Sequence, residues 1–172
     1  MMKKSTQTEE ILKEFINSKE WTQLRRIFLA RIGTPCWILN EFGEFVYKTP
    51  QDSRHCQLIR KDLTLRKRCD EEYLPCLIKQ VESLKKPVIS SCYSGFLGFA
   101  YPLIFHREPI GVVGGCQILD GNLKMEFYKD RATHLKINAD ELYSMVTEAY
   151  SIPPTLLYGM IELAFLISQS FN

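Results

Sequence analysis

The sequence predicts an α+β domain in which an antiparallel β-sheet is flanked by helices. In residues 97–105 every second side chain is large and apolar, which is the period of a β-strand: Leu97, Phe99, Tyr101, Leu103 and Phe105. Residues 109–119 alternate again after a turn-like segment at 106–108. Helical apolar spacing marks both chain ends, in residues 6–32 and 155–167. We therefore expect a central hairpin of two long strands, with helices packed beside it.

The N-terminal region predicts two consecutive helices. Residues 6–19 have apolar residues on one helical face, with Ser5 or Thr6 as the cap, and Asn17-Ser18 marks a break. The second helix continues the spacing from Trp21 and ends near Gly33. We treat residues 1–32 as N-terminal helices and 33–172 as the main domain. These helices either pack against the sheet or form dimer contacts.

The middle of the chain supplies further strands and a long helix. Residues 35–39 and 44–48 predict a hairpin whose turn uses Gly43 where a positive φ is needed. A helix is expected over 63–84, followed by a short strand at 88–92. Beyond the central hairpin we expect a strand within 121–129, a helix that Asn138 caps, a break at Ile152-Pro153-Pro154, and a last apolar helix.

Composition and charge exclude several classes of protein. The 22 basic and 20 acidic residues give a net charge of +2, which argues against binding nucleic acid by charge. Residues 1–10 have no secretory signal, and the longest apolar run, 155–167, contains Glu162 and is too short to span a bilayer. We therefore expect a cytoplasmic protein without a membrane or nucleic-acid partner.

One basic patch has two interpretations. It comprises Arg60, Lys61, Arg66, Lys67 and Arg68. It is either a solvated helix start, offset by the three acidic residues at 70–72, or a site for an anion or a partner.

The central strands also predict a small-molecule site. Gly111, Gly114 and Gly115 within one apolar strand indicate a bulge or a surface that another group approaches closely. Ligand sites are mostly apolar with a few orienting polar groups. The candidate ligand contacts are Tyr93, Phe96, Phe99, Tyr101 and Gln117, and the alternative is that all five belong to the core.

Three of the six cysteines predict a shared site. Cys56, Cys69 and Cys92 each stand at a junction between expected elements, although their separations are unlike the close pairs of zinc knuckles. If they converge, Cys116 or His55 could complete a site for zinc or an iron-sulfur cluster. A redox pair and buried structural thiols are the alternatives, and Cys36 and Cys76 are expected to be packing residues.

A family resemblance rests on motifs in a fixed order. They are Cys56-Gln57-Leu58-Ile59-Arg60, Arg68-Cys69, Lys86-Pro87-Val88-Ile89 leading to Cys92 and Gly95, Ile110-Gly111, and Gly114-Gly115-Cys116-Gln117-Ile118-Leu119. From about Ile27 to Phe171 the chain resembles the PocR sensory-domain family. That family commonly has Cys-His-Ala-Gly where this chain has Cys92-Tyr93-Ser94-Gly95.

The resemblance implies a fold and a function. It implies a PAS-like antiparallel sheet over residues 33–172 and the sensing of small hydrocarbon derivatives in prokaryotic signalling or transcription regulation. Family members usually join this domain to an output domain, and we expect the sensory domain alone here. The expected function is therefore a sensory domain for a small organic ligand. The alternative is a metal, iron-sulfur or redox sensor that uses Cys56, Cys69 and Cys92.

Neither catalysis nor a monomeric state is expected. The sequence has no Gly-rich phosphate loop and no nucleophile matched to a histidine, so we predict a protein that is not an enzyme. The apolar stripes of residues 6–32 and 155–171 predict a homodimer contact that transmits the signal.

Overall fold

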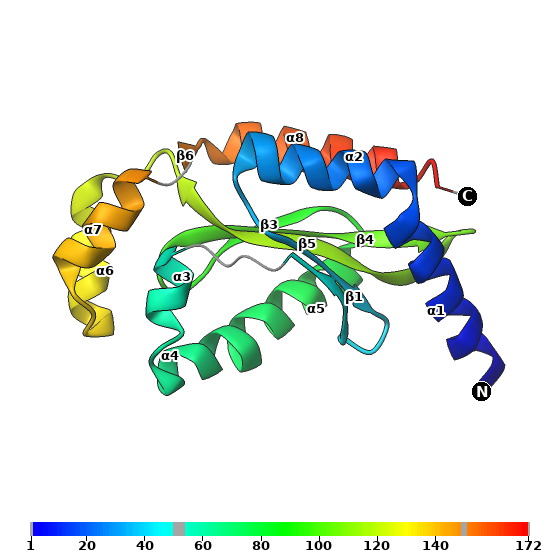
Figure 1. Ribbon diagram of the computed structural model, residues 1–172, viewed down its shortest axis with the longest axis horizontal. Coiled ribbons are helices and arrows are strands. Elements are labelled where there is room, and N and C mark those ends of the chain that lie inside the picture. The colour runs from blue at the N-terminus through cyan, green and yellow to red at the C-terminus, as the bar shows by residue number, and fades with distance from the viewer. Residues whose placement is uncertain (1, 50–53, 149–150, 172) are drawn as a thin grey trace.

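One β-sheet lies between two layers of helices in the computed structural model (Figure 1), which describes residues 2–49, 54–148 and 151–171. Its strand order is β2-β1-β5-β4-β3, and neighbouring strands in this order are antiparallel. A short strand, β6, pairs with β5 in parallel. The strands are β1 Cys36–Asn40, β2 Phe45–Lys48, β3 Val88–Ser91, β4 Phe96–Phe105, β5 Glu108–Asp120 and β6 Ser151–Ile152. The predicted α+β fold, a PAS-like antiparallel sheet flanked by helices, is confirmed.

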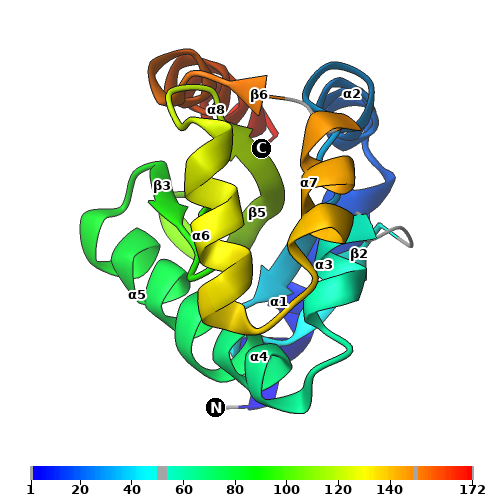
Figure 2. The same ribbon diagram turned by 90° about the vertical axis from the view of Figure 1, so that its left-hand side faces the viewer.

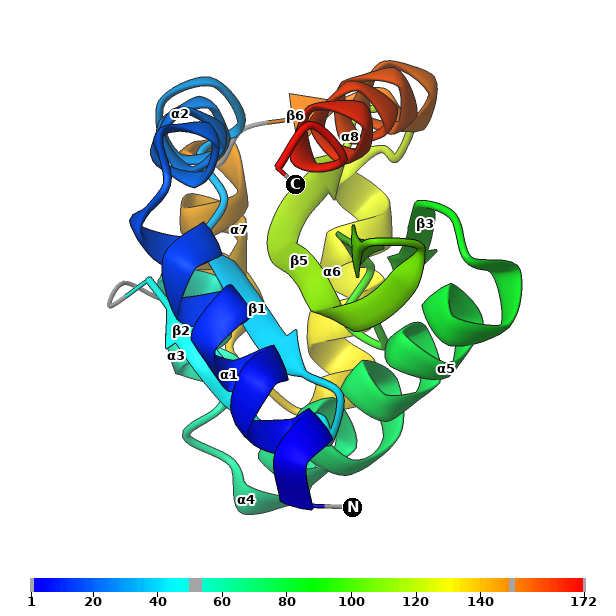
Figure 3. The same ribbon diagram turned by 90° about the vertical axis from the view of Figure 1, so that its right-hand side faces the viewer.

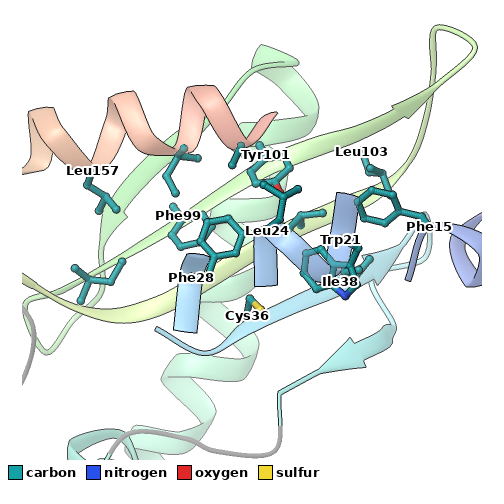
Figure 4. Close-up of a cluster of buried hydrophobic side chains, with 14 of the residues drawn as sticks. Phe15, Trp21, Leu24, Phe28, Cys36, Ile38, Phe99, Tyr101, Leu103 and Leu157 are labelled. Atoms are coloured by element: carbon teal, nitrogen blue, oxygen red, sulfur yellow. The ribbon is translucent and has the colours of Figure 1, made fainter. Parts of the chain in front are cut away.

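One face of the sheet is covered by the helices of the two chain ends (Figures 1 and 3). These are α1 Met2–Asn17, α2 Lys19–Ile27 with its π-helical extension η1 Phe28–Ile32, and α8 Pro154–Ser168. Their apolar side chains form the largest hydrophobic cluster together with β1, β4 and β5. Figure 4 shows part of this cluster, with Phe28 beside Phe99 at a ring distance of 5.1 Å.

The opposite face is covered by the middle of the chain. α3 Arg54–Ile59 and α4 Leu63–Lys67 lead into the π-helical segment η2 Arg68–Tyr73 and then α5 Leu74–Leu84. Leu77 and Val81 of α5 pack against Trp37, Leu39 and neighbouring sheet residues. α6 Met125–Leu135 and α7 Ala139–Glu148 close one end of the sheet, where they pack with α3 and α4 (Figure 2).

The expected helix ends and turn are present. Ser18 caps α2, where its Oγ accepts a hydrogen bond from the Trp21 amide at 3.1 Å. Gly33 ends η1 with φ 67°, and Gly43 has φ 78° in the first hairpin. Asn138 Oδ1 accepts from the amides of Asp140 and Glu141 at 2.9 and 3.0 Å, so it is the predicted cap of α7.

Two expectations about the chain beyond the central hairpin are corrected. The strand predicted within 121–129 is wrong, because α6 begins at Met125. Tyr128 and Ala132 are its buried residues, one helical turn apart, and this spacing prevails over the local β-propensity. The break at Ile152 contains the unexpected strand β6, whose pairing with β5 depends on tertiary contact. The expected place of Tyr150 in the stripe of α7 lies outside the described residues.

The N-terminal helices share a core with the rest of the chain. Leu12, Phe15 and Trp21 are buried in the same cluster as Phe99 and Leu157. The division into residues 1–32 and 33–172 therefore stays a prediction about sequence organisation. In the described ranges, no helix has both the length and the apolar character needed to cross a membrane.

Candidate ligand pocket and cysteine cluster

A β-bulge in the central hairpin shapes the face of the sheet that lies under η2. Leu97 pairs with Ile118 and Phe99 pairs with Gly115, so Cys116 and Gln117 together oppose Gly98. Gln117 has φ 78°, and this left-handed backbone accommodates the extra residue. The Cβ of Cys116 lies 3.3 Å from the position of a Cβ added at Gly98. The bulge thus directs Cys116 to the side where a Gly98 side chain would project.

Tyr73 of η2 fills the space that Gly98 leaves open. A Cβ at Gly98 would collide with the Tyr73 hydroxyl oxygen. This hydroxyl donates a hydrogen bond to the Ser90 carbonyl of β3 at 3.0 Å. Burial raises the pKa of Tyr73 far above its usual range, and the thiols of Cys92, Cys116, Cys69 and Cys56 raise it further. The thiols of the four cysteines proposed as metal ligands therefore all lie near enough to influence this phenol, and we call these four residues the cysteine cluster.

Two of these thiols, those of Cys92 and Cys69, have polar side chains as partners. Cys92 Sγ lies 2.8 Å from Ser94 Oγ. Burial raises the pKa of Cys69, while a hydrogen bond and the charge of Arg60 oppose this rise. Among the residues that the structure describes, no three His, Cys, Asp or Glu side chains are grouped as a metal site. Zinc or iron-sulfur binding by Cys56, Cys69, Cys92 and Cys116 stays a prediction.

His55, the other suggested metal ligand, packs against an aromatic ring. Its imidazole stacks on Phe96 with a ring distance of 3.7 Å and an interplanar angle of 7°. Burial lowers the pKa of His55 to about 3, so the ring is neutral at physiological pH.

The five predicted ligand contacts lie in two regions. Tyr93 borders the cluster: its hydroxyl donates to the Leu65 carbonyl at 2.7 Å, and the thiols of Cys69, Cys92 and Cys56 add to the effect of burial in raising its pKa. Phe96 is in the adjacent hydrophobic cluster, and Gln117 is the buried bulge residue. Phe99 and Tyr101 instead belong to the core under α2 and α8. No single pocket on one face of the sheet can be lined by all five.

A pocket of about 300 Å³ lies beside the cysteine cluster. It is bounded by β1 and the edge strand β2, by α4 and η2, and by the bulge of β5. Its lining residues are Pro35, Cys36, Trp37, Phe45, Lys48, Arg60, Arg66, Cys69, Asp70, Leu74 and Cys116. Two of the four clustered thiols, those of Cys69 and Cys116, therefore face the same pocket, which we call the thiol pocket.

The walls of the thiol pocket combine aromatic surface with an ion pair. Trp37 and Phe45 meet edge to face at a ring distance of 6.3 Å. Arg60 binds Asp70 through two hydrogen bonds of 2.8 and 3.1 Å, and Arg66 lies 3.6 Å from the same carboxylate. Most of these residues were not among the sequence candidates. The spacing of Cys69 and Tyr73, one helical turn apart, is a sequence signal that could have placed these two side chains on one face of the helix.

The fold is that of a small α+β domain with a pocket held against its sheet. The chain belongs to the PocR family: the profile of the sensory domain found in PocR matches residues 14–171. No curated protein matches the chain. Among solved structures, it is similar to an IcIR transcriptional regulator from Alicyclobacillus acidocaldarius, with 14% identity and a TM-score of 0.33. That match covers 73% of this chain and 66% of the other, just under two thirds of its length.

Proposed function

We propose that this sensory domain binds a small organic molecule, a hydrocarbon derivative, in the thiol pocket and thereby regulates a signalling or transcription-regulatory partner. The supporting observation is a 300 Å³ pocket whose Trp37, Phe45 and Leu74 walls reach the thiols of Cys69 and Cys116. A lining that combines apolar walls with a few charged side chains suits a small ligand that must be oriented. Tyr93 borders the cysteine cluster and Gln117 follows Cys116 in the bulge, but neither lines the thiol pocket itself. Their role as ligand contacts therefore stays a prediction, and we propose that Phe99 and Tyr101 act as core residues.

A thermal-shift screen of short alcohols, diols, acids and aromatics tests this proposal. Saturation at 100 times the dissociation constant stabilises the folded state by about 2.7 kcal/mol, which raises the melting temperature of a chain of this size by about 5 to 10 °C. Cys116→Phe, which fills the pocket, should remove the shift. Cys76→Phe is the matched control, because Cys76 is exposed on α5. A flat response of the wild type across the screen would contradict the proposal.

A redox or metal sensor is the second candidate, because four thiols gather around Tyr73. Metal analysis and an ultraviolet-visible spectrum of anaerobically purified protein separate the two functions. A stoichiometric metal or an iron-sulfur absorption band that Cys69→Ser abolishes would favour the metal sensor. A colourless, metal-free protein that still responds to organic ligands would favour the thiol pocket.

We also propose a homodimer formed through α8. Its exposed side has the heptad spacing of a helix–helix seam, with Leu156, Gly159, Leu163 and Leu166. The three leucines are 58%, 59% and 64% exposed. A Cβ at Gly159 would meet no atom within 4 Å, so a second helix can approach closely there.

The proposed role is non-catalytic and cytoplasmic, with no direct binding of nucleic acid. All six cysteines lie among the described residues and none of them forms a disulfide, which suits a reducing compartment. The net charge of +2 gives no strong electrostatic attraction to a polyanion.

A further inference from the structure

The thiol pocket has an excess of positive charge. Among the residues that the structure describes, Lys48, Arg60 and Arg66 line it, together with one carboxylate, that of Asp70. The described lining therefore has two more cations than anions. A concave site with one dominant sign of charge concentrates ligands of the opposite sign.

Asp70 organises these cations rather than cancelling them. Its carboxylate accepts two hydrogen bonds, of 2.8 and 3.1 Å, from the Arg60 guanidinium, and these bonds fix the plane of the guanidinium group. Arg66 approaches the same carboxylate at 3.6 Å. The side chain of Arg60 is 26% exposed, so its charge lies partly within the protein, where screening by salt is weaker.

The rest of the pocket is apolar and limits the size of the ligand. Trp37 and Phe45 form an aromatic corner, and Lys48 Nζ lies 5.9 Å from the centre of the Phe45 ring. A volume of about 300 Å³ holds roughly ten water-sized groups, given about 30 Å³ for each water in the liquid. The complementary ligand is thus a short apolar body with one anionic group.

A second pocket on the same side of the sheet provides a comparison. It lies near the end of α5, has a volume of about 320 Å³, and is lined by Glu41, Glu82, Lys85 and Arg107 together with apolar residues. The charges of its two acidic and two basic residues cancel, so this lining has no net charge. The excess positive charge thus distinguishes the thiol pocket from a neighbour of similar size.

We infer that the ligand of the thiol pocket is a short-chain organic carboxylate, held by Lys48, Arg60 and Arg66 and with its apolar part against Trp37 and Phe45. This inference rests on the proposed function, and it narrows the ligand class from hydrocarbon derivatives in general to their acids. Two residues of the basic patch, Arg60 and Arg66, then belong to an anion site.

Calorimetric titration with three ligands of the same chain length tests the inference: hexanoate, hexanol and hexanamide. We expect hexanoate to bind the wild type at least about tenfold more tightly than either neutral compound, because each charge-assisted hydrogen bond is about twice as strong as a neutral one. Arg66→Gln should weaken hexanoate binding about tenfold and leave the neutral compounds unchanged. Arg107→Gln, in the second pocket, should leave hexanoate affinity unchanged.

The outcomes separate the two proposals. If hexanol or hexanamide binds as tightly as hexanoate, or if Arg66→Gln has no effect on hexanoate, the carboxylate inference is overturned while a small-molecule sensor stands. If none of the three compounds binds and the thermal-shift screen is also flat, the proposed function fails, and the inference fails with it.

Discussion

Gly98 and Tyr73 are the two residues whose fit determines the shape of the cysteine cluster. A methyl group at Gly98 would meet the Tyr73 hydroxyl and lie 3.3 Å from the Cys116 Cβ. The hydroxyl cannot withdraw without losing its hydrogen bond to the Ser90 carbonyl. The close fit of Tyr73 over Gly98 and beside Cys116 therefore brings η2, β4 and β5 together at a single point.

Gly98→Ala is expected to destabilise the fold by about 1 to 3 kcal/mol, the usual cost of overpacking. Tyr73→Phe alone should cost about 1 kcal/mol through the lost hydrogen bond. The double variant removes the colliding hydroxyl, so it should be more stable than the sum of the single effects predicts. Urea unfolding of the four proteins measures this, and simple additivity would contradict the described fit.

Tyr101 and Tyr93 differ in whether their side-chain hydroxyl has a hydrogen-bond partner. The buried Tyr101 hydroxyl has no hydrogen-bond partner among the described residues, whereas Tyr93 donates to the Leu65 carbonyl. Tyr101→Phe should therefore raise the free energy of unfolding by about 1 kcal/mol, and Tyr93→Phe should lower it by a similar amount. If the screen's ligand no longer binds to Tyr101→Phe, Tyr101 is a ligand contact after all.

His55 predicts a specific dependence of stability on pH. Burial lowers its pKa to about 3 in the folded state, whereas an unfolded histidine titrates near 6.5. Below pH 6.5 the unfolded state thus binds more protons, so stability falls with decreasing pH by up to about 1.4 kcal/mol per unit. The loss continues down to the folded pKa.

His55→Gln removes this titration. The free energy of unfolding, measured by urea denaturation between pH 7 and pH 5, should therefore fall less in the variant than in the wild type. Parallel curves for the two proteins would show that His55 is accessible to protons in the folded state.

At the scale of elements, α8 is apolar on both of its sides. Leu157 and Ile161 pack onto the sheet, whereas Leu163 is 59% exposed on the opposite side. Leu163→Lys is expected to convert the proposed dimer to a monomer with little change in protomer stability. Leu84→Lys on α5, where the leucine is 51% exposed, is the matched control and should stay dimeric. Light scattering measures both variants, and a monomeric wild type at high concentration would refute the dimer.

Local patterns predicted most elements, and the exceptions have physical reasons. The alternation in β4 and β5, the cap at Asn138 and the αL position at Gly33 depend on neighbouring residues, so the sequence alone shows them. β6 has two residues and forms only because tertiary contacts bring it beside β5. The sequence predicts a strand at the start of α6 because the first residues of this helix favour strands locally. The helical spacing becomes visible only when Ala132 is included.

At the scale of the whole molecule, the site was harder to predict than the fold. The convergence of Cys56, Cys69 and Cys92 on a shared site, predicted from their places at junctions, stays a prediction, because no three ligand side chains among the described residues are grouped as a metal site. The role of Tyr73, and a pocket built from Trp37, Lys48 and Arg60, depend on how α4 and η2 lie against the strands. Phe96 and Phe99 were both candidate ligand contacts because ligand sites are mostly apolar, but Phe99 packs in the core under α2 and α8.

The central claim is that a small organic ligand binds in the thiol pocket, and the two tryptophans of the chain allow a direct test. Trp37 lines this pocket, whereas Trp21 belongs to α2 and is buried in the hydrophobic cluster on the other face of the sheet. Fluorescence titration with the compound that gives the largest melting shift is therefore carried out on Trp21→Phe and on Trp37→Phe. The account predicts a saturable change in Trp37 emission with the calorimetric dissociation constant and a constant Trp21 emission. A ligand that leaves Trp37 emission unchanged, or alters only that of Trp21, would contradict it.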